Sequence, residues 1–147
     1  MAKVGINLVE QGEGVDQVYF FYRGAGMLTR EFSSDVYGTT QLECGILPEG
    51  SFWGELPCLL GITSYFSLKV NYSRTEKIKI DGSEHCHIYY LEKEDFMDIL
   101  ADYPSFETSI YIRGEIRVAY FKHQAQLRQG EFGYNHKVLN IEQELYL

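Results

Sequence analysis

The chain has 147 residues, enough for one domain with a substantial core, and 45% of them are hydrophobic and 15% aromatic. Its formal net charge of -8 argues against a nucleic-acid partner, because phosphate backbones are bound by clustered Lys and Arg. The three cysteines form no CxxC motif, which indicates free thiols in a reducing compartment. No signal peptide is visible and no apolar run reaches membrane-spanning length. We therefore expect a cytoplasmic protein, or an intracellular domain whose membrane segment lies outside this chain.

The first third of the chain reads as short strands separated by turns. Strands are expected where Val, Ile, Tyr and Phe are enriched between glycine-containing or polar segments, at residues 5–10, 18–22, 27–32 and 39–47. The unbroken apolar and aromatic character of residues 18–22 predicts burial on both faces or a barrel wall. The turn spacing is typical of an antiparallel roll or barrel.

The middle of the chain is less regular. Residues 54–60 predict a short helical turn, with Pro57 at a position that a first turn tolerates. Residues 65–70 are compatible with either a strand or an inserted loop. Residues 76–80 and 85–91 predict a hairpin around the strong turn dipeptide Asp81-Gly82.

Two helices are expected in the C-terminal part. The first covers residues 92–102, and its apolar face is expected to contain Phe96, Ile99 and Leu100. Tyr103-Pro104 ends it, and Ser105 is expected to cap a second helix over about residues 106–127. One face of this second helix is formed at i, i+4 spacing by Phe106, Ile110, either Arg113 or Gly114, Arg117 and Phe121. Residues 128–147 read as a glycine-containing tail, weakly helical at 141–147.

Residues 49–96 contain the parts of a pocket for a phosphorylated, ribose-containing ligand. Gly54 lets the backbone approach a ligand closely, and the amides of a helical first turn attract an anion. Glu55 can accept hydrogen bonds from sugar hydroxyls, and the guanidinium of Arg74 can hold a phosphate. The order of these residues among the expected strands favours a binding site over isolated surface residues.

This order of motifs resembles the cyclic nucleotide-binding domain as found in eukaryotic ion channels, over about residues 6–123. The similarity is carried by residues 9–13 with residues 18–24, by Gly50-Ser51-Phe52-Trp53-Gly54-Glu55-Leu56, by Arg74-Thr75, by Asp95-Phe96 and by Tyr103-Pro104. It implies a mostly β fold: an antiparallel, jelly-roll-like β-roll with a short phosphate-binding-cassette helix and two C-terminal helices. Residues 1–123 would form this domain without the family's leading helices, and residues 124–147 would form a C-terminal tail.

The resemblance also implies roles for individual residues. Glu55 would bind the ribose 2′-hydroxyl, Arg74 the cyclic phosphate, and Thr75 the phosphate or the purine. The backbone amides of Gly54, Glu55 and Leu56 would line the phosphate. The last helix would be a lid over the base, with Arg117 and Phe121 in contact with it. The implied function is a ligand-sensing module that binds cyclic AMP or cyclic GMP and moves its C-terminal helix, as the cytoplasmic domain of a nucleotide-regulated ion channel.

Two departures from the family pattern keep alternatives open. The separation between Glu55 and Arg74 is long, so an alternative alignment places Ser64 at the arginine position. Pro57 lacks an N–H that the family often donates to phosphate. A degenerate domain of the same fold, which binds no nucleotide and serves protein interaction or assembly, is therefore the second hypothesis. A homo-oligomer is compatible with both hypotheses.

No catalytic set is visible, so an enzyme is not expected. No helix-turn-helix pattern follows the expected domain, which argues against a bacterial transcription factor. His85-Cys86-His87 reads as strand surface around a buried cysteine, and it supplies too few ligands for a zinc site. No metal and no cofactor are expected beyond the nucleotide ligand.

Overall fold

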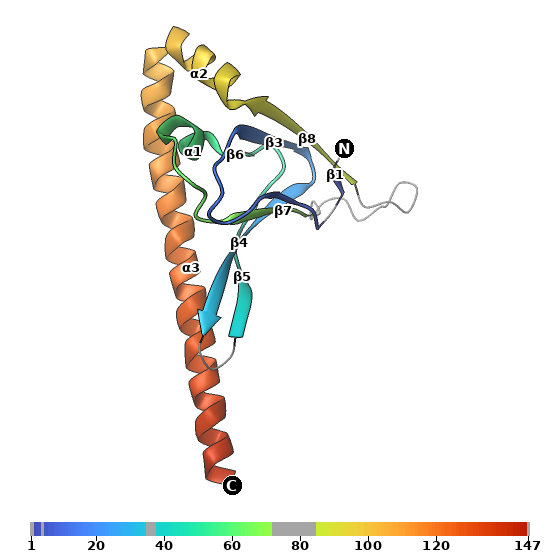
Figure 1. The fold of residues 1–147 in the computed structure, drawn as a ribbon, viewed down its shortest axis with the longest axis vertical. Helices are drawn as coiled ribbons and strands as arrows, with labels where there is room; N and C mark the ends of the chain where they lie inside the picture. Colours follow the sequence, from blue (N-terminus) through green and yellow to red (C-terminus); the bar gives the residue numbers. More distant parts are fainter. Residues whose placement is uncertain (1, 4, 35–37, 72–84, 147) are drawn as a thin grey trace.

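The computed structural model describes residues 2–3, 5–34, 38–71 and 85–146, with the backbone alone described beyond residue 130. Its strands form two four-stranded sheets with the orders β1-β8-β3-β6 and β2-β7-β4-β5 (Figure 1), and every pairing is antiparallel. The expected antiparallel β-roll is thus confirmed. The strands are β1 (Ala2–Lys3), β2 (Asn7–Val9), β3 (Gln17–Arg23), β4 (Ala25–Ser34), β5 (Gly38–Leu47), β6 (Phe52–Trp53), β7 (Ser67–Asn71) and β8 (His85–Glu92).

The two sheets bury one apolar layer between them. Val18 and Phe21 of β3 are 1% exposed, and they share a core cluster with Leu28 of β4 and Leu68 of β7. Gly26 of β4 is needed for this contact, because an added Cβ would lie 2.7 Å from the Phe21 ring. Residues 18–22 were predicted to be buried on both faces or to form a barrel wall, and the exposure of Phe20 and Tyr22, 39% and 59%, excludes the first alternative and agrees with the second. Alternation along the strand places these two aromatic side chains on the outer face.

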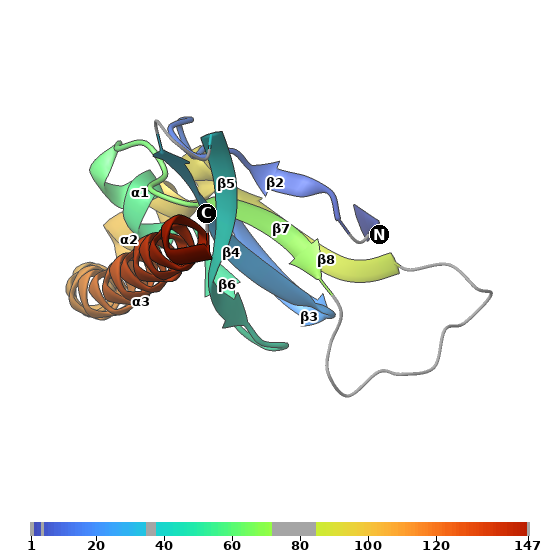
Figure 2. The same cartoon turned by 90° about the horizontal axis from the view of Figure 1, so that it is seen from below.

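The β4–β5 hairpin is the longest feature of the roll. Its register runs from Gly26 opposite Leu47 to Ser34 opposite Gly38. In Figure 1 this hairpin extends beyond the rest of the sheets and lies beside α3, and Figure 2 shows α3 passing across the same end of the roll. The hairpin therefore provides a long flank against which the last helix can pack.

Helix α1 (Glu55–Leu60) follows β6 directly, as expected for residues 54–60. It ends at Gly61, whose positive φ of 66° is the left-handed conformation common after a helix. Residues 65–70 were expected to form either a strand or an inserted loop. Strand β7 (Ser67–Asn71) includes most of them, so the strand is the correct alternative. The predicted strand at 76–80 and the Asp81-Gly82 turn lie outside the described residues.

Helix α2 (Lys93–Asp102) has two acids in its first turn, where they favour the helix dipole. Phe96 and Leu100 are buried as predicted. Ile99 was expected on the same face, but it is 44% exposed. The buried stripe of α2 runs through Phe96 and Leu100, which are four residues apart. Ile99 lies to one side of this stripe, so its side chain does not meet the roll.

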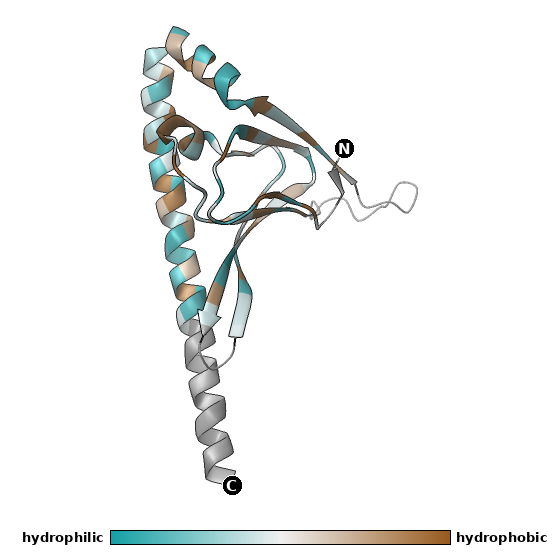
Figure 3. Cartoon of the chain, viewed as in Figure 1, coloured by the Kyte–Doolittle hydropathy of each residue, from teal (hydrophilic) through white to brown (hydrophobic). Residues whose placement is uncertain are grey.

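Helix α3 (Pro104–Tyr146) is longer than expected and begins earlier. The helix starts at Pro104, because proline is well suited to a first helical position, so Ser105 lies inside the helix and is not its cap. The expected end near residue 127 is wrong, since each glycine of the tail weakens a helix by only about 1 kcal/mol. Phe106, expected on the inner face, is 53% exposed. Figure 3 shows that the hydrophobic residues of α3 gather where it passes α1.

Among the described residues, no helix combines the length and the hydropathy needed to cross a membrane.

Candidate functional site

The turn into α1 requires a glycine at position 54. Gly54 has a φ of 106°, and an added Cβ would lie 2.6 Å from the backbone carbonyl oxygen of Gln17. A side chain at this position is therefore strained twice, by its backbone conformation and by a rigid neighbour. This close packing fixes the start of α1 against β3.

We expect Gly54→Ala to lower the free energy of unfolding by about 2–3 kcal/mol, the scale of a non-glycine residue held in an unfavourable conformation. The matched control is Gly50→Ala, because Gly50 also has a positive φ of 84° but no atom within 4 Å of its added Cβ. Urea denaturation of both variants measures the difference. Equal losses would show that the contact with Gln17 adds nothing.

Glu55, the first residue of α1, is a buried carboxylate held by the last helix. It is 3% exposed, and its Oε1 accepts a hydrogen bond from Nη2 of Arg117 on α3, forming an ion pair. Its Oε2 is buried and has no hydrogen-bond partner among the described residues. Glu55 is therefore shielded from solvent, and one of its two carboxylate oxygens has a hydrogen-bond partner among the described residues while the other does not.

The surroundings of Glu55 oppose its charge. Burial raises the pKa of the Glu55 carboxyl, while Arg117 and the nearby backbone N–H groups partly offset the rise. Arg117 is itself held by aromatic rings, with its guanidinium carbon 4.9 Å from the ring centres of both Phe52 and Trp53. The ion pair thus joins α3 to β6 and α1 together.

Two glycines let α3 approach the roll. Gly114 of α3 packs against Leu56, where an added Cβ would lie 3.3 Å from the Leu56 Cβ. Gly45 of β5 faces Phe121, and an added Cβ would lie 2.2 Å from that ring. Phe121 is 8% exposed and contacts Trp53 edge-on, with ring centres 5.8 Å apart. Helix α3 is therefore firmly seated on β5, β6 and α1.

A cavity of about 440 Å³ lies beside this seat. Its walls come from the loop after β2, from β4 and β6, from α1 and the segment following it, and from α3. The lining residues are Gln11, Gly12, Arg30, Trp53, Leu56, Pro57, Ile62, Thr63, Ser64, Tyr65, Phe66, Val118 and Lys122. The volume falls in the range that holds small organic ligands, and the wall is mostly apolar with a few polar groups, as such sites usually are.

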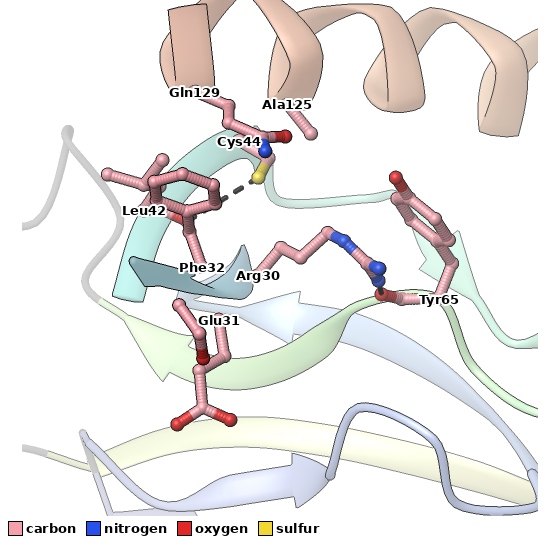
Figure 4. Close-up of a pocket in the computed structure, with 9 residues that line it drawn as sticks. Arg30, Glu31, Phe32, Leu42, Cys44, Tyr65, Ala125 and Gln129 are labelled. Atoms are coloured by element: carbon pink, nitrogen blue, oxygen red, sulfur yellow. Dashed lines mark hydrogen bonds between the residues drawn. The ribbon is translucent and has the colours of Figure 1, made fainter. Parts of the chain in front are cut away.

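Tyr65 brings two basic side chains together at the cavity. The Arg30 guanidinium carbon lies 3.7 Å from the Tyr65 ring centre, and Lys122 Nζ lies 4.7 Å from it. Arg30 Nη1 also donates a 2.7 Å hydrogen bond to the Tyr65 carbonyl oxygen. Figure 4 shows Arg30 extending from its strand to this carbonyl in a second, smaller cavity of about 140 Å³, lined also by Ala125 and Gln129 of α3.

The structure brings four of the expected ligand-binding residues, Gly54, Glu55, Leu56 and Arg117, to the α1–α3 contact. Phe121 lies further along α3 and packs against Gly45 of β5 and Trp53 of β6. Of these expected ligand-binding residues only Leu56 lines the cavity, because the α3 residues that do so are Val118 and Lys122.

The predicted phosphate ligands Arg74 and Thr75 lie outside the described residues. Ser64, from the alternative alignment, does line the cavity. It is 3% exposed, and its hydroxyl donates a 2.5 Å hydrogen bond to the Phe66 carbonyl oxygen. Sequence reasoning missed Arg30, Tyr65 and Lys122, and a helical face shifted by one residue from Arg117 and Phe121 would have found Lys122.

The cysteines and histidines suggest no reactive centre in the described part of the chain. Burial raises the pKa of the Cys58 thiol to about 11, and this thiol donates a hydrogen bond to the Val15 carbonyl oxygen. Cys86 is buried and His87 exposed, as the strand reading of this segment predicted. No group of three metal-ligating side chains occurs among the described residues.

No family model and no curated protein matches the chain. Solved structures do. The Thermus thermophilus catabolite activator protein has a TM-score of 0.57 at 16% identity, over 82% of this chain and 50% of its own. The global regulator CLP of Xanthomonas campestris, described as responsive to cyclic di-GMP, has a TM-score of 0.60 at 11% identity, over 90% and 57%. The regulatory domain of Toxoplasma gondii PKA, solved with cyclic AMP, has a TM-score of 0.51 at 20% identity, over 75% and 38%.

These similarities show the fold: the chain shares the β-roll architecture found in these three proteins. The chain spans about half or less of the length of most of these proteins. None of the three structures named here is an ion channel, so the channel type expected from the sequence is not supported by them.

Proposed function

We propose that the chain is a regulatory domain that binds a cyclic nucleotide, cyclic AMP or cyclic GMP, and transmits the binding through α3. The observation that carries the proposal is the cavity of about 440 Å³, whose wall contains residues of both α1 and α3. A ligand in such a cavity contacts the helix that would move. Its different affinities for the two positions of α3 would then shift the balance between them.

The ion pair between Glu55 and Arg117 supports this coupling. Glu55 does not line the cavity, because α3 covers it with Gly114 and Arg117. A sugar hydroxyl that hydrogen-bonds to Glu55 must therefore displace or reorient Arg117. Nucleotide binding and the seating of α3 would compete for the same carboxylate, which links the two events energetically.

Calorimetry with cyclic AMP and cyclic GMP, and with cyclic di-GMP as a third probe, tests binding. Hydrogen exchange of residues 110–123 with and without the bound nucleotide tests the coupling. We expect saturable binding below millimolar concentration and a change in the protection of this segment. Strand β8, which has no residue among those lining the two cavities, is the internal control. The sequence alone predicts greater protection when ligand is bound, whereas competition between the ligand and Arg117 for Glu55 predicts lower protection, so the sign of the change distinguishes the two.

Equal protection of residues 110–123 at saturating ligand would mean that α3 is not the moving element. The absence of binding by all three nucleotides at millimolar concentration would contradict the proposal itself.

Two observations favour a second function, that of a degenerate domain serving protein interaction or assembly. Glu55 is already neutralised by Arg117, and Pro57 removes an N–H from the first turn of α1. In that case α3 is a fixed structural element rather than a lid. The same calorimetry distinguishes the two functions, because the degenerate domain gives no heat with any of the nucleotides.

The proposal includes an effector, which is the part of the full-length protein that responds to the movement of α3. The gate of an ion channel, with this chain as its cytoplasmic domain and assembled as a homo-oligomer, is one such effector. Neither function proposed here requires catalysis or a metal ion.

A further inference from the structure

The charge of the cavity wall is opposite to the charge of the protein. The whole chain carries a formal net charge of -8. The described residues that line the larger cavity nevertheless include Arg30 and Lys122 and no Asp or Glu. The chain has 21 acidic residues and 13 basic ones, so a cavity wall whose charged residues are both cations is unusual for it. Such a wall favours an anionic ligand.

Both cations have donors left for a ligand. Within the described part of the chain, neither Arg30 nor Lys122 forms an ion pair with a carboxylate. Arg30 uses Nη1 for the Tyr65 carbonyl oxygen, which leaves other N–H groups of its guanidinium. Lys122 has three donors, its Nζ lies 4.7 Å from the Tyr65 ring centre, and it forms no hydrogen bond with another described residue.

Tyr65 explains why the two charges act together. Its ring lies within 5 Å of both cationic groups, at 3.7 Å from the Arg30 guanidinium carbon and 4.7 Å from Lys122 Nζ. Two like charges held at one ring repel each other, and an anion that contacts both removes this repulsion. Half-buried Arg30 and exposed Lys122 thus place two cationic groups near one ring at the edge of an apolar cavity.

We propose that Arg30 and Lys122 hold the phosphate of the ligand, while Trp53, Leu56 and Val118 contact its base. This inference rests on the proposed function, and it identifies phosphate-binding residues outside the stretch in which sequence reasoning sought them. Arg30 belongs to β4 and Lys122 to α3. A phosphate bound between them joins α3 directly to the sheet, independently of the Glu55–Arg117 pair.

The test uses the fluorescence of Trp53, which is the only tryptophan of the chain and lines the cavity. Wild-type protein is titrated with cyclic AMP, cyclic GMP, 5′-AMP and pyrophosphate, and the affinities are confirmed by calorimetry. The variants are Arg30→Gln and Lys122→Gln. The matched control is Arg113→Gln, which removes an exposed cation from the same helix but does not line the cavity.

Each cavity variant is expected to weaken binding about 10- to 100-fold, the range for losing one charge-assisted hydrogen bond. Arg113→Gln is expected to change the affinity less than twofold. Lys122 is exposed, so Lys122→Gln keeps the test valid even if Arg30→Gln fails to fold.

The outcomes separate this inference from the proposed function. Cyclic nucleotide binding that is unaffected by both substitutions overturns the inference and leaves the function. Binding of 5′-AMP or pyrophosphate alone, weakened by Arg30→Gln and Lys122→Gln, supports the inference and overturns the function. The absence of binding by all four probes overturns both.

Discussion

Replacing Arg117 by Met is expected to lower the free energy of unfolding by about 3–5 kcal/mol at pH 7.5. This is the usual cost of removing one partner of a buried ion pair, because the other charge stays buried and unpaired. Glu55 is 3% exposed and its Oε2 has no hydrogen-bond partner among the described residues, so without Arg117 its charge is left with the partial support of the nearby backbone N–H groups. Met keeps much of the apolar length that packs on Phe52 and Trp53. Chemical denaturation measures the loss.

The control for this substitution is a double-mutant cycle. Glu55→Gln removes the charge that Arg117 neutralises, so Glu55→Gln/Arg117→Met is expected to recover most of the stability that Arg117→Met loses. Strictly additive effects of the two changes would show that the pair contributes no coupling energy.

The pH dependence follows from the raised pKa of Glu55. A carboxyl with a raised pKa binds its proton more tightly in the folded than in the unfolded protein. Its contribution to stability therefore falls as the pH rises from the ordinary value through the raised one. Without Arg117 the pKa of Glu55 rises further, so the penalty of Arg117→Met is expected to shrink when the pH is lowered toward 5. A penalty that is constant with pH would mean that packing, not charge, causes it.

Truncating Phe121 to Ala is expected to cost about 3–5 kcal/mol, as is usual for removing a buried aromatic ring. Phe121 is 8% exposed and fills the space between Trp53 and the bare backbone of Gly45. The loss leaves a cavity that rigid β5 cannot close. Thermal and urea unfolding measure it, and Trp53 fluorescence reports the local change.

The matched control is Ile116→Ala, a truncation on the same helix at a residue that is 66% exposed. It is expected to change the stability by less than about 0.5 kcal/mol, as surface substitutions usually do. A similar loss for both variants would mean that α3 is not seated through Phe121. Gly45→Ala provides the complementary result, since it is expected to destabilise the wild type more than the Phe121→Ala variant.

The strands and short helices could be predicted from local signals. Alternating or clustered aromatic and β-branched residues marked β3, β4 and β5, and glycines or Pro-Gly segments marked their ends. The glycine before Glu55 marked the start of α1, where the structure requires a positive φ. These signals depend on residues a few positions apart, which a single sequence contains.

The contacts of the site depend on distant residues, and these could not be predicted. Glu55 and Arg117 are 62 positions apart, and Arg30 and Tyr65 are 35 apart. Which residue of α3 meets α1 depends on the rotation of the helix, and an error of one position separates Arg117 and Phe121 from the cavity-lining Val118 and Lys122. The sequence predicted Leu56, which lines the cavity, but the two α3 residues that it named do not.

The length of α3 has a mechanical consequence. At 1.5 Å per residue, the helix from Arg117 to Tyr146 is a rod of roughly 44 Å beyond the ion pair. A tilt of only about 5° at the ion pair would displace its far end by roughly 4 Å. A side-chain rearrangement at the ion pair that is too small to alter the roll would thus produce a larger displacement at the C-terminal end of α3. A partner bound to that end would experience the larger displacement.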